Sequence, residues 1–424
     1  MKGRESLLPA SGLPLLYFGY AHLCLALALG ALIVRPALPG GYFYHPQMVA
    51  LVHLVTLGWI SSSILGAFYI VAPLALRMAF RPGIVDRIAS LAYAGGVSGM
   101  ITGVWMGEYR LMAWSAVPVT ATLLFVSVRA WWGLPRAPVP WPVKLHVALA
   151  FANVLGAAAL GIAIGLARAH GGGSWSPVAA AFAHAHLAAI GWAVMMVVGL
   201  SYRLIPMIVP AAMPTSASMA WSAVLLEVGV IGLTFSLLFQ TVWTPFCGAV
   251  VVAGLAVFVA HVRGIVQHKM PPPAALPRPD WATWQTHVAF MWLLIATALG
   301  VVLTLPFART ATIPLQWTYG IAGLVGFLSQ VVIGIQGRLL PLHGYYRMFQ
   351  ARGLKPPERS AHSLASPALA KATLFTWSIG VPLLAAGLAS ATSALTATAA
   401  VLLMCGVVCN AAQGIRVSTA NSTG

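Results

Sequence analysis

Long apolar stretches follow one another along almost the whole chain, and short segments rich in proline, glycine or arginine separate them. A helix that crosses a bilayer needs roughly 20 consecutive apolar residues. Each stretch is long enough, so each predicts one membrane-spanning helix. The twelve predicted spans cover approximately residues 13–34, 46–73, 86–108, 111–131, 143–166, 177–206, 216–239, 242–263, 282–304, 313–341, 366–390 and 394–415. We therefore expect an all-α membrane protein in which residues 1–424 form a single transmembrane domain.

The composition supports this interpretation and excludes other classes of protein. Hydrophobic residues make up 60% of the chain and charged residues only 7%, and the mean hydropathy is +0.89. Soluble domains carry about 25% charged residues, so a cytosolic globular enzyme is excluded. The net charge of +17 arises because only six acids oppose 23 lysines and arginines. Since membrane proteins carry such cations in their loops, we predict the lipid bilayer as a partner and no nucleic-acid binding.

The basic residues are distributed unequally between the two sides that these spans create. When the N-terminus is placed inside, all but four of the 23 lysines and arginines fall in inner segments. The four in outer segments are Arg35, Arg110, Arg168 and Arg309. Cytoplasmic loops of membrane proteins are enriched in lysine and arginine, so we expect both the N and the C terminus to be cytoplasmic.

Three segments of the chain share one motif at intervals of four helices. The motif that begins at His53 reads H-L-x3-G-W-x6-G-x2-Y-x3-P, and the segment from His186, 133 residues later, repeats every position. A third segment, 135 residues further on, keeps the glycines and the proline but has Ile321 in place of the histidine. Internal similarity at a fixed interval indicates repeated structural units. We predict three four-helix repeats in a pseudo-threefold arrangement: residues 13–131, 143–263 and 282–415.

The histidines of this motif are candidate ligands of a haem. His53 and His186 occupy matched positions on helices that are predicted to run in the same direction, so they share one depth in the outer half of the membrane. Two facing imidazoles there would bind a haem iron from both sides, as in low-spin electron-transfer haems. The chain has no C-x-x-C-H motif, which excludes covalent c-type attachment. The alternative is that both histidines only form hydrogen bonds between helices.

Three further residues extend this candidate site. His184 lies two residues from His186 and points about 200° away around the helix, so it could hold a second haem or a copper ion. His45, at the outer mouth of the second span, is a candidate partner for it. Glu227 is the only acid in the interior of a predicted helix, where an ionised carboxylate costs about 2.5–3.5 kcal/mol. A metal ligand, a proton relay and a buried hydrogen bond remain open roles for Glu227.

Twelve helices in three four-helix arcs, with a histidine such as His53 on the second helix of an arc, resemble subunit I of the haem–copper oxidase superfamily. The His184-Ala185-His186 sequence also resembles the NnrS-like membrane proteins, which have twelve helices and bind haem and copper. The resemblance implies haem b and copper as cofactors, and a function in respiratory electron transfer or in handling oxygen or nitric oxide. It also implies a multi-pass protein of a bacterial inner (cytoplasmic) membrane, with quinol or a cytochrome subunit as electron donor.

The chain departs from the oxidases at two places. Their tenth helix carries an H-x-H pair and their seventh an adjacent His-His, whereas residues 313–341 and 216–239 contain no histidine. We therefore expect no standard oxygen-reducing haem–copper centre; as an enzyme, the chain would be a membrane oxidoreductase. Two other classes stay open: a twelve-helix secondary transporter without a redox cofactor, and a metal-free structural or assembly relative of the oxidases. The four-helix unit disfavours the transporter, because familiar twelve-helix carriers divide into halves of six.

Overall fold

The computed structural model describes residues 7–9, 12–40, 44–271, 278–305 and 312–420. Over this part of the chain the regular structure is helical, apart from one isolated β-bridge between Ala211 and Lys269. The α-helices are α2 (Leu13–Val34), α3 (Pro46–His53), α4 (Ser62–Leu74), α5 (Ile84–Met106), α6 (Tyr109–Gly133), α7 (Trp141–Ala169), α8 (Pro177–His186), α9 (Met195–Ile208), α10 (Ala220–Leu238), α11 (Thr244–Gln267), α12 (Trp281–Leu303), α13 (Thr312–Ile321), α14 (Gln330–Ala351), α15 (Pro367–Ala389) and α16 (Ser393–Ser418). The π-helical segments are η1 (Leu54–Ser61), η3 (Leu187–Val194) and η6 (Ala322–Ser329), and the short 3-10 segments are η2 (Leu134–Arg136), η4 (Ala217–Met219) and η7 (Ala361–Leu364). Among the described residues, twelve continuous spans are long and apolar enough to cross a membrane, which confirms the prediction of twelve membrane-length helical spans.

The observed spans follow the predicted ones closely, with one clear difference at the tenth. The sequence predicts that this span ends at Pro341, but α13, η6 and α14 form one continuous span that reaches Ala351. Pro341 lies inside α14, although a proline in a helix interior removes a hydrogen bond. Contacts with distant segments stabilise the end of α14. Arg347 donates a hydrogen bond to the carbonyl of Ser418 at 2.8 Å, and Gln350 donates one to the carbonyl of Pro9 at 3.1 Å.

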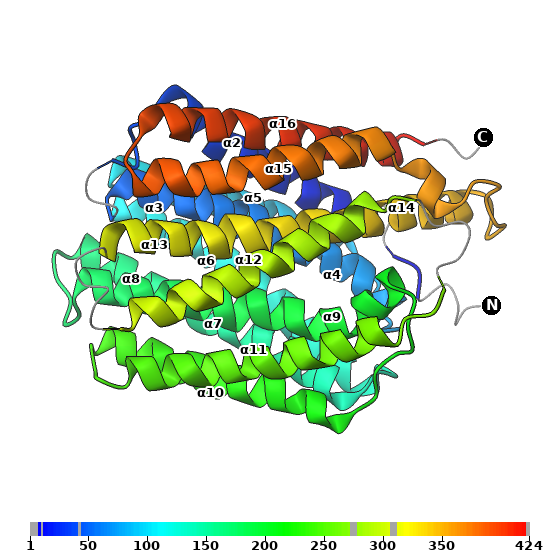
Figure 1. The fold of residues 1–424 in the computed structure, drawn as a ribbon, viewed down its shortest axis with the longest axis horizontal. Coiled ribbons are helices and arrows are strands. Elements are labelled where there is room, and N and C mark those ends of the chain that lie inside the picture. Colours follow the sequence, from blue (N-terminus) through cyan, green and yellow to red (C-terminus); the bar gives the residue numbers. More distant parts are fainter. Residues whose placement is uncertain (1–6, 10–11, 41–43, 272–277, 306–311, 421–424) are drawn as a thin grey trace.

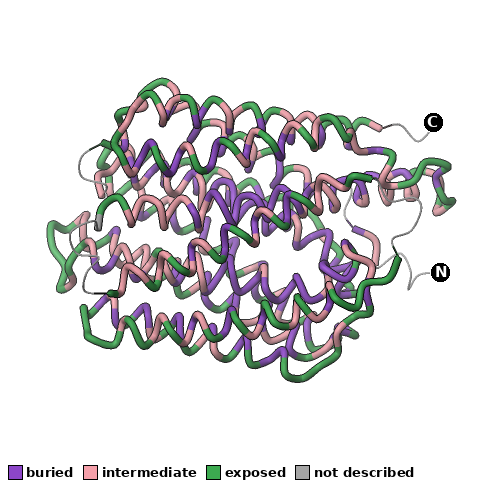
Figure 2. Tube along the Cα trace, in the orientation of Figure 1, coloured by how far each residue is buried: buried purple, intermediate pink, exposed green. Residues whose placement is uncertain are grey.

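Three central spans each contain an eight-residue π-helical segment, a feature that the sequence motif does not predict. The segments η1, η3 and η6 begin one residue after His53, His186 and Ile321, so their starts are 133 and 135 residues apart, as in the sequence motif. π-Helical turns are rare and occur frequently at functional sites. The three segments contact one another, and Figure 2 shows mostly buried residues along the middle of the bundle.

The first glycine of the motif allows a neighbouring helix to approach each π-helical segment closely. A Cβ atom at Gly58 would lie 2.7 Å from Sγ of Cys24 on α2, and one at Gly191 would lie 2.9 Å from the Cβ of Asn153 on α7. A Cβ atom at Gly326 would lie 2.7 Å from a tryptophan side chain of α12. Only glycine, which has no Cβ, permits these approaches. Helix packing therefore explains why the motif carries this glycine.

The helices run along one long axis of the molecule, and several sequential helices pack as pairs (Figure 1). α5 packs on α6, α10 on α11 and α15 on α16, while α16 also packs on α2. The outward faces of these helices are apolar, and Leu23, Val228 and Val408 are each more than half exposed. Large exposed apolar surfaces mark contact with a membrane or a partner. The fold is therefore compatible with a multi-span protein in a lipid bilayer.

Candidate functional site

The structure brings His53 and His184 together inside the bundle. His53 ends α3 and His184 lies near the end of α8; their ring centroids are 6.3 Å apart, with 22° between the ring planes. The Nδ1 atom of His53 donates to the carbonyl of Val49 at 2.8 Å, and that of His184 donates to the carbonyl of Ala157 at 3.0 Å. Neither Nε2 atom forms a hydrogen bond to another described residue. The Nε2 lone pairs are therefore available to a ligand.

The hydrogen bond of His184 is stronger evidence for a ligand site than the hydrogen bond of His53. A bond from Nδ1 to the carbonyl four residues earlier is common in this chain and occurs at His22, His53, His146, His170, His186, His261 and His268. The bond of His184 instead crosses to α7, so tertiary packing sets the orientation of its ring. In metal-binding histidines, the N–H group of the second ring nitrogen usually donates a hydrogen bond to a carbonyl or carboxylate in this way.

The spacing of the two rings fits a metal ion between them. Two imidazoles that bind one metal from opposite sides, through bonds of about 2.0–2.1 Å, have centroids roughly 6 Å apart. The observed separation of His53 and His184 is 6.3 Å. Gly161 on α7 leaves room for the His184 ring, because a Cβ atom at this glycine would lie 2.9 Å from its Cε1 atom. The pair thus has two Nε2 donor atoms without a described partner and a ring separation that a metal ion between two imidazoles would require.

His186 packs against Tyr319 of α13 rather than against His53. The Tyr319 hydroxyl lies 3.2 Å from Nε2 of His186, and the two ring centroids are 5.9 Å apart. Because Nδ1 of His186 donates to the carbonyl of Phe182, Nε2 accepts the hydrogen of the tyrosine hydroxyl. Both nitrogens of His186 are thus engaged. The sequence predicts His53 and His186 as the facing pair, whereas the structure brings His53 together with His184.

Tyr319 is the residue near the site that sequence reasoning missed. It lies two residues before Ile321, which is the position that His184 occupies relative to His186 in the preceding motif. That register could have identified Tyr319, because it places a polar side chain where the preceding motif has His184. The three spans that carry the motif therefore each contribute a polar side chain to this region.

His45 lies apart from the pair and caps α3. Its Nδ1 atom accepts a hydrogen bond from the backbone of Met48 at 3.4 Å, and its Nε2 atom donates to the carbonyl of Leu38 at 3.1 Å. Both nitrogens therefore have local partners. The structure brings His45 into no ring contact with His184 among the residues it describes.

Glu227 lies on α10 and is also separate from the histidine pair. It accepts a hydrogen bond from the side chain of Asn153 at 2.7 Å, and the same amide nitrogen donates to the carbonyl of Gly191 at 3.2 Å. This contact joins α10, α7 and η3 within the apolar part of the bundle. On α7, Asn153 lies one turn before Ala157, which accepts the hydrogen bond of His184. The carboxyl group is thus linked to the His184 region through α7 and not through a direct contact.

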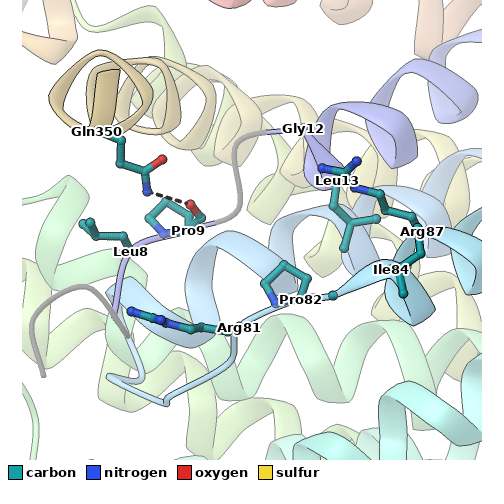
Figure 3. A pocket seen from close by; sticks show the side chains of 10 residues that line it. Leu8, Pro9, Gly12, Leu13, Arg81, Pro82, Ile84, Arg87 and Gln350 are labelled. Atoms are coloured by element: carbon teal, nitrogen blue, oxygen red, sulfur yellow. Dashed lines mark hydrogen bonds between the residues drawn. The ribbon is translucent and has the colours of Figure 1, made fainter. Parts of the chain in front are cut away.

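A hollow of about 420 Å³ lies elsewhere, between the start of α2, the start of α5 and the end of α14 (Figure 3). Arg81 and Arg87 line it on two sides, and the Gln350 amide donates to the carbonyl of Pro9 across one wall. Its described lining contains no histidine and no acid. The candidate histidines and Glu227 therefore do not open into this hollow.

Comparison with known proteins provides no further identification. No protein-family model matches the chain, and no curated protein matches it in sequence.

Proposed function

We propose that the chain binds haem b through His53 and His184. The observation that carries this proposal is the pair of imidazoles 6.3 Å apart whose Nε2 atoms have no partner among the described residues. A haem iron takes four ligands from its porphyrin and needs only axial ligands from the protein, so two histidines suffice, and the bound group would supply one-electron redox chemistry. The chain itself orients the two rings through the carbonyls of Val49 and Ala157. Both histidines are half-buried between apolar helices.

The proposal includes an architecture of three four-helix repeats around a pseudo-threefold axis, with both termini in the cytoplasm. The matched positions of η1, η3 and η6 and the contacts among them support it. The repeats are also supported by the first glycine of each motif, which is closely approached by α2 in the first copy, by α7 in the second and by α12 in the third. The excess of lysine and arginine in the inner segments supports the orientation.

We assign the chain, on this basis, to the divergent relatives of subunit I of the haem–copper oxidases, with the NnrS-like proteins as a second point of resemblance. The function would be electron transfer or the handling of oxygen or nitric oxide in a bacterial inner membrane, with quinol or a cytochrome subunit as donor. α10 contains no histidine and the described part of the tenth span contains only His343, so neither carries the histidine pair of a standard oxygen-reducing centre. Copper is the other metal that two imidazoles suit.

A reduced-minus-oxidised visible spectrum of the purified protein, with pyridine haemochrome quantitation, tests the proposal. We expect sharp α bands from haem b in the wild-type protein and in His186→Ala, and their loss in His53→Ala and His184→Ala. Loss in His186→Ala as well would assign that histidine to the iron. Metal analysis of the same samples would identify copper in place of haem. A haem-free and copper-free protein that is well folded would refute the proposal.

The hydrogen-bonded carboxyl of Glu227 supports a second candidate function, a secondary transporter without a redox cofactor. Acidic residues within membrane spans frequently mark ion or proton pathways. In that case Glu227→Gln should abolish transport while the fold and the absence of haem stay unchanged. A haem-free protein without transport activity would leave the metal-free structural relative as the better description.

A further inference from the structure

The hollow between the starts of α2 and α5 and the end of α14 is large enough for a small ligand. Its volume of about 420 Å³ lies within the range of roughly 300–1,000 Å³ that is typical of ligand pockets. Arg81 lines it from the segment before α5, and Arg87 lines it from the first turn of α5 (Figure 3). Neither His53 nor His184 belongs to its described lining, so the hollow is separate from the histidine pair.

The described lining of the hollow is cationic and contains no acid. Asp86, which precedes Arg87 in the sequence, is only 3% exposed, and its carboxylate pairs with Arg129. That carboxylate also accepts hydrogen bonds from the hydroxyl of Tyr69 at 2.8 Å and from the backbone of Gly83 at 2.7 Å. The guanidinium of Arg87 is exposed and forms no hydrogen bond or ion pair with another described residue. It is therefore available to an anionic ligand.

The face of α5 that carries Arg87 is otherwise apolar and points out of the bundle. Ile84, Ile88 and Leu91 are each more than half exposed. Together with Arg87 they occupy positions i, i+3, i+4 and i+7, which lie on one side of a helix. In a bilayer this apolar face of α5 would contact acyl chains, and Arg87 lies at its end beside the hollow. The surface therefore combines a cationic hollow with an adjoining apolar face.

We propose that the hollow binds the headgroup of an anionic phospholipid. Arg87 holds the phosphate, Arg81 supplies a second cation, and the acyl chains lie along the apolar face of α5. Arginine suits this role because its planar guanidinium donates two parallel hydrogen bonds to a phosphate. Basic pockets between membrane helices are known to bind anionic headgroups. A soluble phosphate ester would share the contact with Arg87 but would leave the apolar face uncovered. This inference does not depend on haem binding.

The walls of the hollow distinguish this lipid from those that surround any membrane protein. Arg129 of α6 donates to the carbonyl of Arg81 at 2.7 Å, which ties the segment before α5 to a neighbouring helix. Gln350 of α14 donates to the carbonyl of Pro9 at 3.1 Å, which ties the segment before α2 to the opposite wall (Figure 3). A preformed pocket lowers the entropic cost of binding. The bound lipid should therefore exchange more slowly than its neighbours in the bilayer.

Native mass spectrometry of the full chain, purified in detergent and stripped of lipid, tests the site. The probes are phosphatidylglycerol, which is anionic, and phosphatidylcholine with the same acyl chains, which is zwitterionic. We expect one phosphatidylglycerol to bind at least about fivefold more tightly than phosphatidylcholine. Arg87→Gln should lower its affinity at least about fivefold, the contribution of one arginine near an anionic lipid. Equal affinities for the two lipids would overturn the proposal.

The matched control is Arg136→Gln. Arg136 follows α6 in η2 and is also exposed, and it donates to the carbonyl of Trp132 at 2.7 Å. This variant should keep the wild-type affinity for phosphatidylglycerol. An equal loss in Arg87→Gln and Arg136→Gln would reduce the effect to overall charge and would overturn the proposal. Arg81→Gln provides the same measurement should Arg87→Gln fail to fold.

Two further measurements test whether the phosphate belongs to a lipid. Ile88→Gln places a polar group on the apolar face of α5 and should lower the affinity for phosphatidylglycerol at least about threefold. Val408→Gln on α16 is its control, because Ile88 and Val408 are both 59% exposed. Glycerol phosphate, which lacks acyl chains, should not displace the lipid at the same concentration. Equal affinities in these two variants, or displacement by glycerol phosphate, would assign the hollow to a soluble phosphate ester and overturn the lipid.

Discussion

Replacement of Gly161 by alanine should weaken haem binding without unfolding the protein. The added Cβ atom would lie 2.9 Å from Cε1 of His184, whereas carbon atoms in contact prefer about 3.5–4.0 Å. The ring must therefore move by roughly 0.6–1 Å, which exceeds the tolerance of about 0.2 Å for a metal–ligand bond. Disturbing the groups that orient a metal-binding histidine typically lowers metal affinity about 10–100-fold. We expect a loss of this size in haem affinity.

The matched control is Gly156→Ala on the same helix. A Cβ atom at Gly156 would lie 3.5 Å from Cδ2 of Leu187, an ordinary contact distance. Both substitutions should raise helix stability by about 0.8–1.0 kcal/mol, because alanine is the better helix former. Titration of haem into the haem-free variants, followed by visible absorption, gives the two dissociation constants, and thermal unfolding verifies the fold. Equal haem affinities in Gly161→Ala and Gly156→Ala would refute the assignment of His184 as a ligand.

Three more outcomes are expected from the contacts of Tyr319, Gly326 and His362. Tyr319→Phe removes the hydrogen bond to His186, so the free energy of unfolding should fall by about 0.5–1.5 kcal/mol. The haem content should stay at the wild-type level. Loss of haem would contradict the pairing of His53 with His184. Gly326→Ala would place a methyl group 2.7 Å from a tryptophan side chain of α12, and such overpacking costs about 1–3 kcal/mol; an unchanged midpoint of thermal unfolding would show that the packing is looser than described. Burial and the charge of Arg338 lower the pKa of His362, so the unfolded state binds the proton more readily and stability should fall as the pH drops below about 6.5. His362→Gln should flatten this pH dependence of the thermal unfolding midpoint. Parallel plots of the midpoint against pH for the wild-type protein and His362→Gln would contradict the effect of Arg338 on His362.

Hydropathy was sufficient to place the helices because a membrane-spanning helix satisfies its backbone hydrogen bonds within itself. Each span is therefore encoded by a local run of apolar residues, and the ends of eleven spans needed little information from elsewhere. The tenth span is the exception, since contacts of Arg347 and Gln350 with distant segments extend it past Pro341. The motif interval also predicted where the three spans are alike, although not that η1, η3 and η6 are π-helical.

The sequence therefore established the number of spans, the repeated motif and the presence of histidines within the apolar helices. It also placed His184 and His186 on different sides of one helix, because two residues correspond to about 200° of rotation. Which of the two approaches His53 was decided only by tertiary structure. The rotation of α8 about its own axis depends on contacts with helices distant in the sequence: the carbonyl of Ala157 holds His184, and the hydroxyl of Tyr319 holds His186. No local pattern encodes that rotation, because it results from the packing of all neighbouring helices at once.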